Sequence, residues 1–252
     1  MILSFAGKKR GGSGSWPVRP KPSLSVCDEE FRLMSIVDRI EAHRQEVLRG
    51  KLTCGVARCP LCDGDPGTFS LHERRRRGFW VVLERLIQKL VSLLPRWKCP
   101  LCRGTFTEYP DFALPHKRYV APEIQQRSHV YVGQEDATYA KAAQDKEMAV
   151  CHEGDEGQSQ GQCLSASTVW RWVGFLGALK ATVRRAARLV RQRVPRLGLA
   201  RTVYAVAARK YRSPARRQIV QRCLQLLALG DLLDRLFGVG IFPRSATAAS
   251  FT

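Results

Sequence analysis

The first regular pattern of apolar and polar positions lies between residues 28 and 49, where apolar residues recur at helical spacing. One face of this segment carries Phe31, Met34, Val37 and Ile40. Asp28 is a candidate N-cap, two acidic residues follow it, and Gly50 ends the pattern. We therefore expect a helix within residues 26–50, packed by its apolar stripe against the core or against a second copy of the chain in a homodimer.

Between residues 63 and 98 the pattern fits two different structures. The helical alternative is carried by Leu83, Leu86, Ile87, Leu90, Val91 and Leu94. The strand alternative has to accommodate Pro95, which is tolerated in an edge strand or at the end of a helix. Both alternatives stay open. Beyond this segment we expect a strand at residues 105–107, a two-proline connector at 109–119 and a short helix at 122–127.

The C-terminal part of the chain, residues 163–238, is patterned as helices. The expected helices are 165–194, 199–211, a segment that Ser213 caps with Pro214 in its first turn, and 231–237. Gly230 is predicted to separate the last two helices. The tail, residues 239–252, is expected to be irregular.

Two further segments lack an apolar pattern. Residues 1–25 are rich in Gly, Ser and Pro and carry several cations, which predicts a flexible basic arm. Residues 133–162 are acidic and rich in Gly and Gln, which predicts a linker with one helix over 137–150. Residues 51–132 then form a separate region between the N-terminal helix and this linker.

The composition indicates what kind of partner the protein binds. The chain has 252 residues, of which 44% are hydrophobic, so a packed core is expected. Its formal net charge is +20 and its sequence pI is about 10.2. Such a charge repels itself unless a polyanion neutralises it, so nucleic acid is the expected partner and a membrane surface is the second choice.

Membrane insertion is not expected. The best apolar stretch, Phe79 to Leu94, is interrupted by three charged residues, which makes it too short and too charged to span a bilayer. The first residues run into a basic cluster without the apolar core of a secretory signal. We expect a cytoplasmic, nucleoid-associated protein, in a compartment where paired cysteines bind metal more often than they form disulfides.

Acidic residues are absent from one long block of the chain. From Gly157 to Gly230 there is no Asp or Glu. A helical face that only needs solvation usually mixes charge signs, because like charges four residues apart repel. The exclusion of acids therefore indicates an anionic partner, and the candidate phosphate contacts are Arg184, Arg185 and Arg188.

The strongest chemical signal is the tetrapeptide Cys-Pro-Leu-Cys, which occurs at residues 59–62 and 99–102, each time with a glycine two positions later. Four thiolates from two such turns suit a closed tetrahedral Zn²⁺ site. A closed site leaves no position for water, so the metal would be structural and its binding energy would be folding energy. The predicted ligands are Cys59, Cys62, Cys99 and Cys102. Weaker alternatives are an iron–sulfur cluster, a redox dithiol, or a substitute ligand from Cys54 or His72.

A second candidate site begins at Ser165, whose hydroxyl can cap a helix. The face expected to be buried carries Val169, Trp172, Val173 and Leu176. A helix whose first turns present Ser, Thr and Arg outward is how a helix-turn-helix reads the major groove. The candidate nucleic-acid contacts on this helix are Ser165, Ser167, Thr168, Trp170 and Arg171.

Three motifs together resemble a known group of proteins. They are Leu114-Pro115-His116-Lys117-Arg118-Tyr119, the second cysteine hook with Thr105-Phe106-Thr107, and the segment 167–172. These motifs are similar to those of small bacterial proteins carried by or related to insertion sequences, which pair an N-terminal zinc ribbon with a helix-turn-helix. The resemblance covers residues 55–180, and the tail shows a weaker similarity.

The resemblance implies that the four cysteines bind zinc, that the helix from Ser165 touches DNA, and that the segment entering Cys99 is a strand. One departure concerns the turn of the helix-turn-helix. That turn is short in compact examples, whereas residues 151–162 here form a long Gly-rich stretch. The first helix of the motif therefore has no assignment.

Catalysis is not expected. A metal-dependent transposase needs three acidic residues that hold two metal ions on a nuclease fold, and residues 157–230 contain none. Nor does the chain contain a Gly-rich phosphate loop, an H-E-x-x-H motif or a nucleophile elbow.

The predicted fold class is α+β, mostly α, with a small four-cysteine zinc ribbon followed by a helix-turn-helix-like basic helical domain. The predicted function is non-catalytic binding of double-stranded DNA in association with a mobile element, with a separately encoded transposase as a further partner. The alternatives are an RNA-binding or protein-docking zinc-ribbon module, and an end-recognition subunit of a transposition complex.

Overall fold

The computed structural model describes residues 35–50, 52–56, 58–83, 86–143, 148–152, 159–162, 164–195, 213–242 and 245–248. The predicted basic arm, residues 1–25, lies outside these ranges, as does the expected helix over 199–211.

The N-terminal helix, α2, spans Ile36–Arg49. Its N-cap is Ser35, whose hydroxyl accepts a hydrogen bond from the Asp38 N–H; the predicted cap, Asp28, lies outside the described residues. Gly50 ends the helix in the left-handed conformation, with φ 69°, as the pattern predicts. The buried positions of the helix are Ile40, His43 and Val47.

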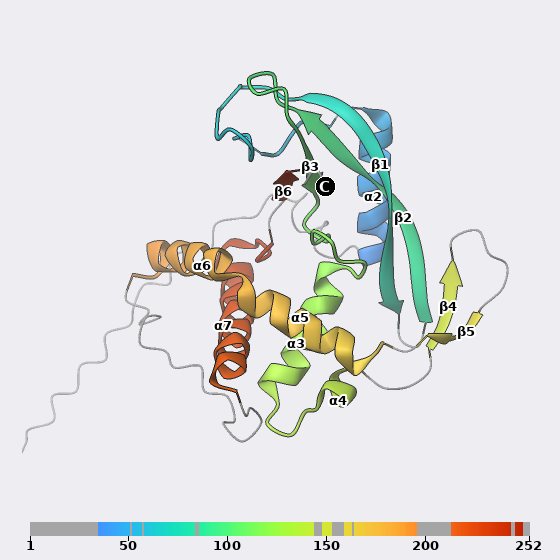
Figure 1. Cartoon of the computed structure of the whole chain (residues 1–252), viewed down its shortest axis with the longest axis vertical. Coiled ribbons are helices and arrows are strands. Elements are labelled where there is room, and N and C mark those ends of the chain that lie inside the picture. The colour runs from blue at the N-terminus through green and yellow to red at the C-terminus, as the bar shows by residue number, and fades with distance from the viewer. Residues whose placement is uncertain are drawn as a thin grey trace, which may run out of the picture. The chain divides into compact units, whose positions relative to one another are not determined.

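Two long strands follow, β1 (Ser70–Leu83) and β2 (Leu86–Lys98), and they pair as an antiparallel hairpin (Figure 1). The strand alternative for residues 63–98 is therefore correct and the helical one is wrong. On one face of the hairpin Phe79 shares a core cluster with Ile40 of α2, and on the other Ile87 belongs to the core of the C-terminal helices. Because both faces are covered, apolar residues in β2 do not alternate, and their spacing imitates a helix.

β2 is the centre of a six-stranded sheet. The other strands are β3 (Thr105–Tyr109), β4 (Met148–His152), β5 (Ser159–Gln162) and β6 (Ser245–Ala248). On the edge opposite β1, β2 pairs antiparallel with β3 at its end and parallel with β4 at its start. Pro95 lies one residue outside the segment paired with β3, so β2 has a single neighbouring strand there, where proline is tolerated.

The structure corrects two predictions of irregular chain. The predicted linker, residues 133–162, contains β4, β5 and a short helix, α4 (Tyr139–Ala143), which is the described helical part of the helix expected over 137–150, since residues 148–150 belong to β4. The tail contains β6, which pairs with β3. Each of these strands has four or five residues and pairs with a partner distant in sequence, so the local pattern carries little signal for it. The short helix predicted at 122–127 is longer, and α3 spans Ala121–Gly133.

The C-terminal helices differ from the prediction at two points. The helix expected over 165–194 is interrupted at Leu179, whose ψ of 57° divides it into α5 (Ala166–Ala178) and α6 (Lys180–Arg193). The last helix, α7 (Pro214–Phe237), begins at Ser213 as predicted but continues through Gly230 and ends at Gly238. A Cβ at residue 230 would lie 3.3 Å from Ile241, so the glycine there provides close packing and not a helix stop.

Helices α3, α5, α6 and α7 share one large core, to which Ile124, Val169, Trp172 and Leu226 contribute. The fold is thus mixed α+β, with a larger strand component than a small ribbon. No helix-turn-helix is present among the described helices, because residues 144–165, which include β4 and β5, separate α4 from α5. None of these helices is both long enough and apolar enough to cross a bilayer.

Candidate metal centre and nucleic-acid interface

The two cysteine hooks face each other and bring four sulfur atoms together. The Sγ atoms of Cys59 and Cys102 are 3.8 Å apart, and those of Cys62 and Cys99 are 4.0 Å apart. All four sulfurs lie within 4.8 Å of one another. Tetrahedral geometry with Zn–S bonds of about 2.3 Å places sulfurs about 3.8 Å apart. The predicted ligands therefore form a cluster with the donor type and spacing of a four-coordinate metal site.

Both hooks adopt the same turn. The N–H of the first cysteine donates to the carbonyl of the glycine five residues later, at 2.9 Å, in Cys59–Gly64 and in Cys99–Gly104. The residue after the second cysteine is left-handed in each, with φ 56° at Asp63 and 58° at Arg103. This repeated turn shows how a local motif at two places in the sequence can produce matching halves of one site.

Each hook also packs on the glycine of the other. A Cβ at Gly104 would lie 2.4 Å from Leu61 Cδ1, and a Cβ at Gly64 would lie 2.7 Å from Leu101 Cδ1. The two leucines are otherwise exposed, at 45% and 62% of their surface. Glycine at both positions therefore permits the close approach of the hooks, which explains why it follows each Cys-Pro-Leu-Cys.

The cluster rests on a small core of its own. Cys59 and Cys99 are buried, whereas Cys62 and Cys102 are exposed. The buried pair shares a hydrophobic cluster with Trp97 of β2 and Phe106 of β3. The hairpin strand that enters the second hook and the strand that leaves it thus supply the apolar base of the site.

A buried carboxylate lies within this base. Glu108 is 2% exposed, and its two oxygens accept hydrogen bonds from Trp97 Nε1 at 2.7 Å and from the Gly55 N–H at 3.1 Å. Both donors are thereby satisfied, and the segment before the first hook is joined to β3. The role of Glu108 cannot be predicted from the sequence, because both of its partners become neighbours only through the fold.

The pKa values of the hook cysteines depend on their neighbours in the cluster. The N–H of Cys102, with that of Leu101, lowers the pKa of Cys99 to about 7. The N–H of Gly64 lowers the pKa of Cys62, but desolvation and hydrogen bonds with the other three sulfurs raise it to about 12 overall. Four sulfurs this close cannot all be thiolates on their own, whereas a divalent metal ion would hold all four deprotonated.

The two substitute ligands do not join the cluster. Among the described residues the group of side chains that could hold a metal ion consists of the four hook cysteines. The Cys54 thiol lies 3.9 Å from the Val56 carbonyl oxygen, and burial raises its pKa to about 11. His72 is exposed on β1.

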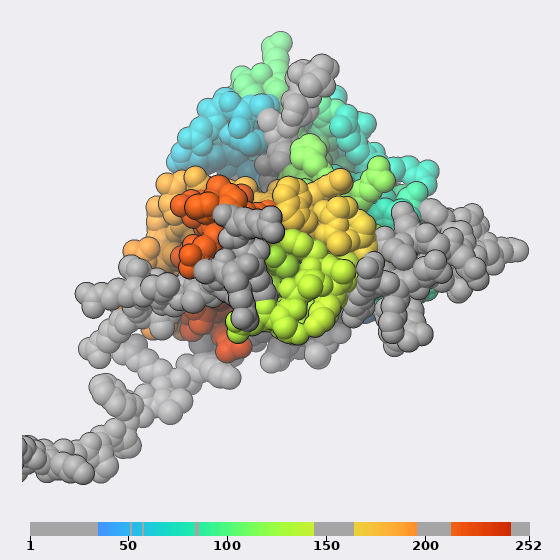
Figure 2. Space-filling view, turned by 60° about the horizontal axis from the view of Figure 1, so that its bottom comes forward, coloured from blue at the N-terminus to red at the C-terminus, as the bar shows by residue number. Residues whose placement is uncertain are grey.

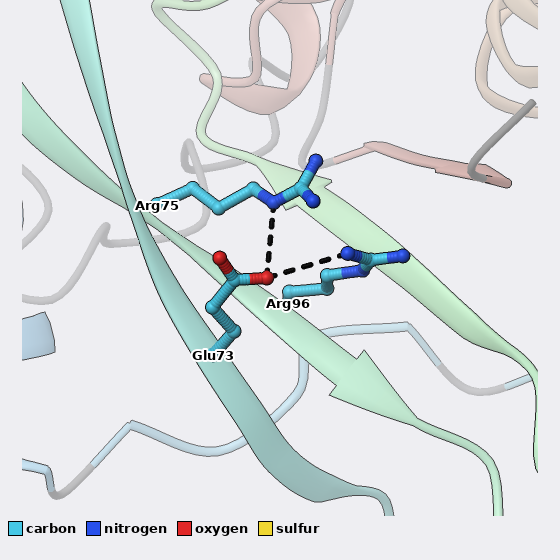
Figure 3. A network of polar contacts seen from close by, with 3 residues as sticks. All are labelled: Glu73, Arg75 and Arg96. Carbon is cyan, nitrogen blue, oxygen red and sulfur yellow. Dashed lines mark hydrogen bonds and ion pairs between the residues drawn. The ribbon is translucent and has the colours of Figure 1, made fainter.

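Three of the four arginines in the run on β1, residues 74–77, have partners within the protein. Arg74 Nε donates to the Val47 carbonyl of α2, and Arg77 donates to the Tyr109 hydroxyl and to two connector carbonyls. Figure 3 shows Glu73 between Arg75 and Arg96, with N···O distances of 3.1 and 3.3 Å, and Arg75 lowers the pKa of this carboxyl. These cations have structural partners and are poor candidates for phosphate contacts.

The cations of α6 are arranged differently. The buried side of this helix carries Val183, Ala186, Ala187 and Val190. The exposed positions of the helix include Lys180, Arg184, Arg185, Arg188, Arg191 and Arg193. Within the described part of the chain no acid pairs with any of these cations. The three arginines predicted as phosphate contacts thus lie on one exposed, uncompensated basic face.

Helix α5 begins as predicted, since the Ser165 hydroxyl accepts a hydrogen bond from the Thr168 N–H at 3.3 Å. The predicted buried face is correct at Val169, Trp172, Val173 and Leu176. Ser167 and Arg171 are exposed on the opposite side, and Trp170 is 49% exposed. In Figure 2 the yellow surface of α5 lies beside the yellow-green surface of α3 and α4, which it contacts.

Two cations from distant segments lie on the flanks of α5. Arg216 of α7 stacks over the Trp170 ring at 4.6 Å and donates to the Tyr139 hydroxyl at 2.7 Å. Lys117 Nζ of the connector lies 4.3 Å from the Phe175 ring centroid. The sequence reveals the basic-aromatic composition of the connector but not that it reaches α5.

A family model described as a domain of unknown function, DUF6431, matches residues 59–149. The chain matches no curated protein and no solved structure. The matched segment begins at the first hook cysteine and includes both hooks, the hairpin, the connector, α3 and α4, whereas α5, α6 and α7 lie beyond it. The cysteine cluster is therefore part of the matched domain, and the basic helical face is not.

Proposed function

We propose that this protein binds double-stranded DNA through the outward faces of α5 and α6, and that a structural Zn²⁺ ion stabilises the cysteine end of the molecule. The observation that carries the proposal is the contrast between two groups of cations. Arg74, Arg75 and Arg77 of the hairpin have partners within the protein, whereas the α6 arginines form an exposed face without acids among the described residues. A polyphosphate backbone is the partner that such a face suits.

The roles of the two helices follow from their surfaces. α6 presents Arg184, Arg185 and Arg188 for phosphate contacts, which give affinity without sequence information. α5 presents Ser167, Trp170 and Arg171, side chains that can enter a groove. An exposed helix with this composition is the recognition element of the proposal, and the proposal does not depend on a preceding short-turn helix.

Zinc fits the four-cysteine cluster because soft thiolates at tetrahedral spacing are its usual structural ligands. Cys59, Cys62, Cys99 and Cys102 would hold the ion. With all four positions filled by sulfur, the ion would supply folding energy, roughly 10–16 kcal/mol in small zinc modules, and no Lewis-acid chemistry. The proposed function is therefore recognition without bond breaking.

A salt titration of duplex binding tests the DNA proposal. If six to ten phosphates are neutralised, affinity falls by roughly 10³–10⁵ between 50 and 200 mM salt. The triple variant R184Q/R185Q/R188Q should lower the slope of log K against log salt by about 2–3, at about 0.9 per lost phosphate contact.

The matched control is R49Q/R76Q/K141Q, which removes the same charge from exposed positions on α2, β1 and α4. Its slope should remain near that of the wild type. Equal losses in both triple variants would show only a response to net charge, and salt-independent binding would contradict the proposal. Adding structured RNA as a competitor decides the RNA alternative, which predicts that RNA displaces the duplex.

The association with a mobile element rests on the resemblance of the three motifs and stays a prediction. A nuclease-type gene beside the coding sequence would support it, and it would also favour a role in recognising element ends for a separate transposase.

A further inference from the structure

Two cations from distant parts of the chain meet on the exposed side of α5. Lys117 belongs to the connector, and its Nζ lies 4.3 Å from the ring centroid of Phe175. Arg171 precedes Phe175 by four residues, so both point from the same side of the helix. Desolvation lowers the pKa of Lys117, and the nearby charge of Arg171 lowers it further.

No described carboxylate compensates this pair. Neither cation has an ion-pair partner within the described ranges, and among the described residues Arg171 is the charge that lowers the pKa of Lys117. Like charges at short distance repel, and partial desolvation makes the repulsion stronger. An anion bound between them would relieve this cost.

The fold holds the pair in place without help from a ligand. Arg77 donates to the Lys117 carbonyl at 2.9 Å, and the Trp80 N–H donates to the Arg118 carbonyl at 2.8 Å, so the connector is attached to β1. On the other side, Tyr119 packs edge-on against Trp172 of α5 with a centroid distance of 5.1 Å. The connector backbone and α5 are therefore fixed relative to each other.

We infer that Lys117 and Arg171 together bind one phosphate group, and that this site fixes the register of α5 on the nucleic-acid backbone. A guanidinium can bind a phosphate in bidentate fashion, and the lysine adds a point charge on the other side of the same group. Ser167, one turn before Arg171, is left to face the groove. The inference rests on the proposed function and adds the connector to the interface, assigning Arg171 to the backbone and not to a base.

Duplex binding by K117Q, R171Q and the double variant tests the site. Each single variant should lower the salt slope by about 0.9, and the double variant should lower it by no more than a single one, because both side chains share one phosphate. K141Q is the control, since it removes an exposed lysine that is paired with Asp136. A doubled loss in the double variant, an unchanged slope in the singles, or a base preference relaxed by R171Q would overturn the inference.

A second measurement separates failure of this site from failure of the DNA proposal. Inorganic phosphate, titrated against chloride at equal ionic strength, should shift the ¹³Cε NMR signal of Lys117 in the wild type and not in R171Q, while the Lys141 signal stays constant. If no duplex binds but this shift occurs, the phosphate site stands and the proposed function falls. Suppose instead that R184Q/R185Q/R188Q impairs duplex binding, that the Lys117 NMR signal does not respond to phosphate, and that K117Q binds the duplex like the wild type. The proposed function then stands and the phosphate site falls.

Discussion

At the scale of single residues, the cysteine hooks provide candidate metal ligands and also the close packing of one hook on the other. Leu61 and Leu101 each cross to the opposite hook and occupy space that a Cβ at Gly104 or Gly64 would need. The repeat of Cys-Pro-Leu-Cys with its glycine is therefore a packing device as well as a set of ligands. Its turns are local, which is why the four ligands can be identified from spacing alone.

Metal stoichiometry tests the ligand set. Replacing Cys99 by Ser should abolish binding of about one Zn²⁺ per chain at physiological concentrations, because a closed site loses one of its four soft donors. Metal analysis after gel filtration gives the stoichiometry, and Co²⁺ substitution gives the absorption of a thiolate tetrahedron. Cys54→Ser is the control, since this thiol lies outside the cluster and its loss should leave the stoichiometry unchanged.

The carboxylate beneath the hooks has a measurable role. Glu108→Ala should lower the free energy of unfolding by about 2–4 kcal/mol, because the Trp97 Nε1–H and the Gly55 N–H would both be left without an acceptor. Glu108→Gln should cost less, since its amide oxygen can still accept one of these bonds. Urea unfolding at neutral pH measures both, and equal stability of all three proteins would show that water replaces the carboxylate.

Residue-scale prediction is limited where contact joins distant segments. The exposure of Ser167 and Arg171 follows from helical spacing, and the structure agrees. The approach of Lys117 to α5 depends on the hairpin, the connector and Trp172 all being in place. Nothing in the spacing of residues along the chain reveals that approach, although the basic-aromatic composition of the connector is visible.

At the scale of elements, sequence patterns predict the wrong structure where both faces of a strand are covered, or where a glycine makes room for a neighbouring side chain. β2 is apolar on both faces, so the spacing of its apolar residues resembles that of a helix. Gly230 lies inside α7, where Ile241 packs closely against it, so a glycine predicted to end a helix instead lies in its interior. The break at Leu179 has no glycine or proline of its own; there Arg222 of α7 donates to the Gly177 carbonyl at 2.8 Å and stabilises the end of α5.

The crossing of α5 and α7 supplies an element-scale prediction. A Cβ at Gly177 would lie 2.1 Å from the Ile219 carbonyl oxygen, and the α7 backbone cannot move aside as a side chain could. Gly177→Ala should therefore destabilise the protein by about 1–3 kcal/mol, despite the higher helix propensity of alanine.

Thermal unfolding followed by circular dichroism measures this loss. Gly174→Ala, one turn earlier on α5, is the matched control, because its Cβ would meet only Arg216 Nη1 at 3.3 Å. That variant should be near neutral. A neutral Gly177→Ala would show that the two helices separate at little cost.

At the scale of the whole molecule, the hydrophobic residues form separate clusters. The cysteine end has its own small cluster around Trp97 and Phe106, whereas the C-terminal helices share the large one. The hairpin connects the two, since Ile87 lies in the helical core and Trp97 in the cysteine end. Stability is therefore expected to be uneven between these parts.

Metal removal tests this division. A chelator should unfold the hooks and expose Trp97, because the proposed ion would supply most of the folding energy of so small a cluster. The helical circular dichroism should largely remain, since the core of α3, α5, α6 and α7 contains none of the ligands. Tryptophan fluorescence and circular dichroism recorded on the same samples measure both, and restoring Zn²⁺ should reverse the change. Joint loss of both signals would show one cooperative unit.

The pairing of β3 with β6 can form only late in the synthesis of the chain. Residues 106–109 leave the ribosome early, but their partners, residues 245–248, emerge only after roughly 140 further residues, or about 7–28 s of translation. During that interval the outer edge of β3 has no strand beside it and could pair with a neighbouring nascent chain. Chaperones that shield extended backbone during elongation would therefore matter more for the yield of this protein than for its final stability.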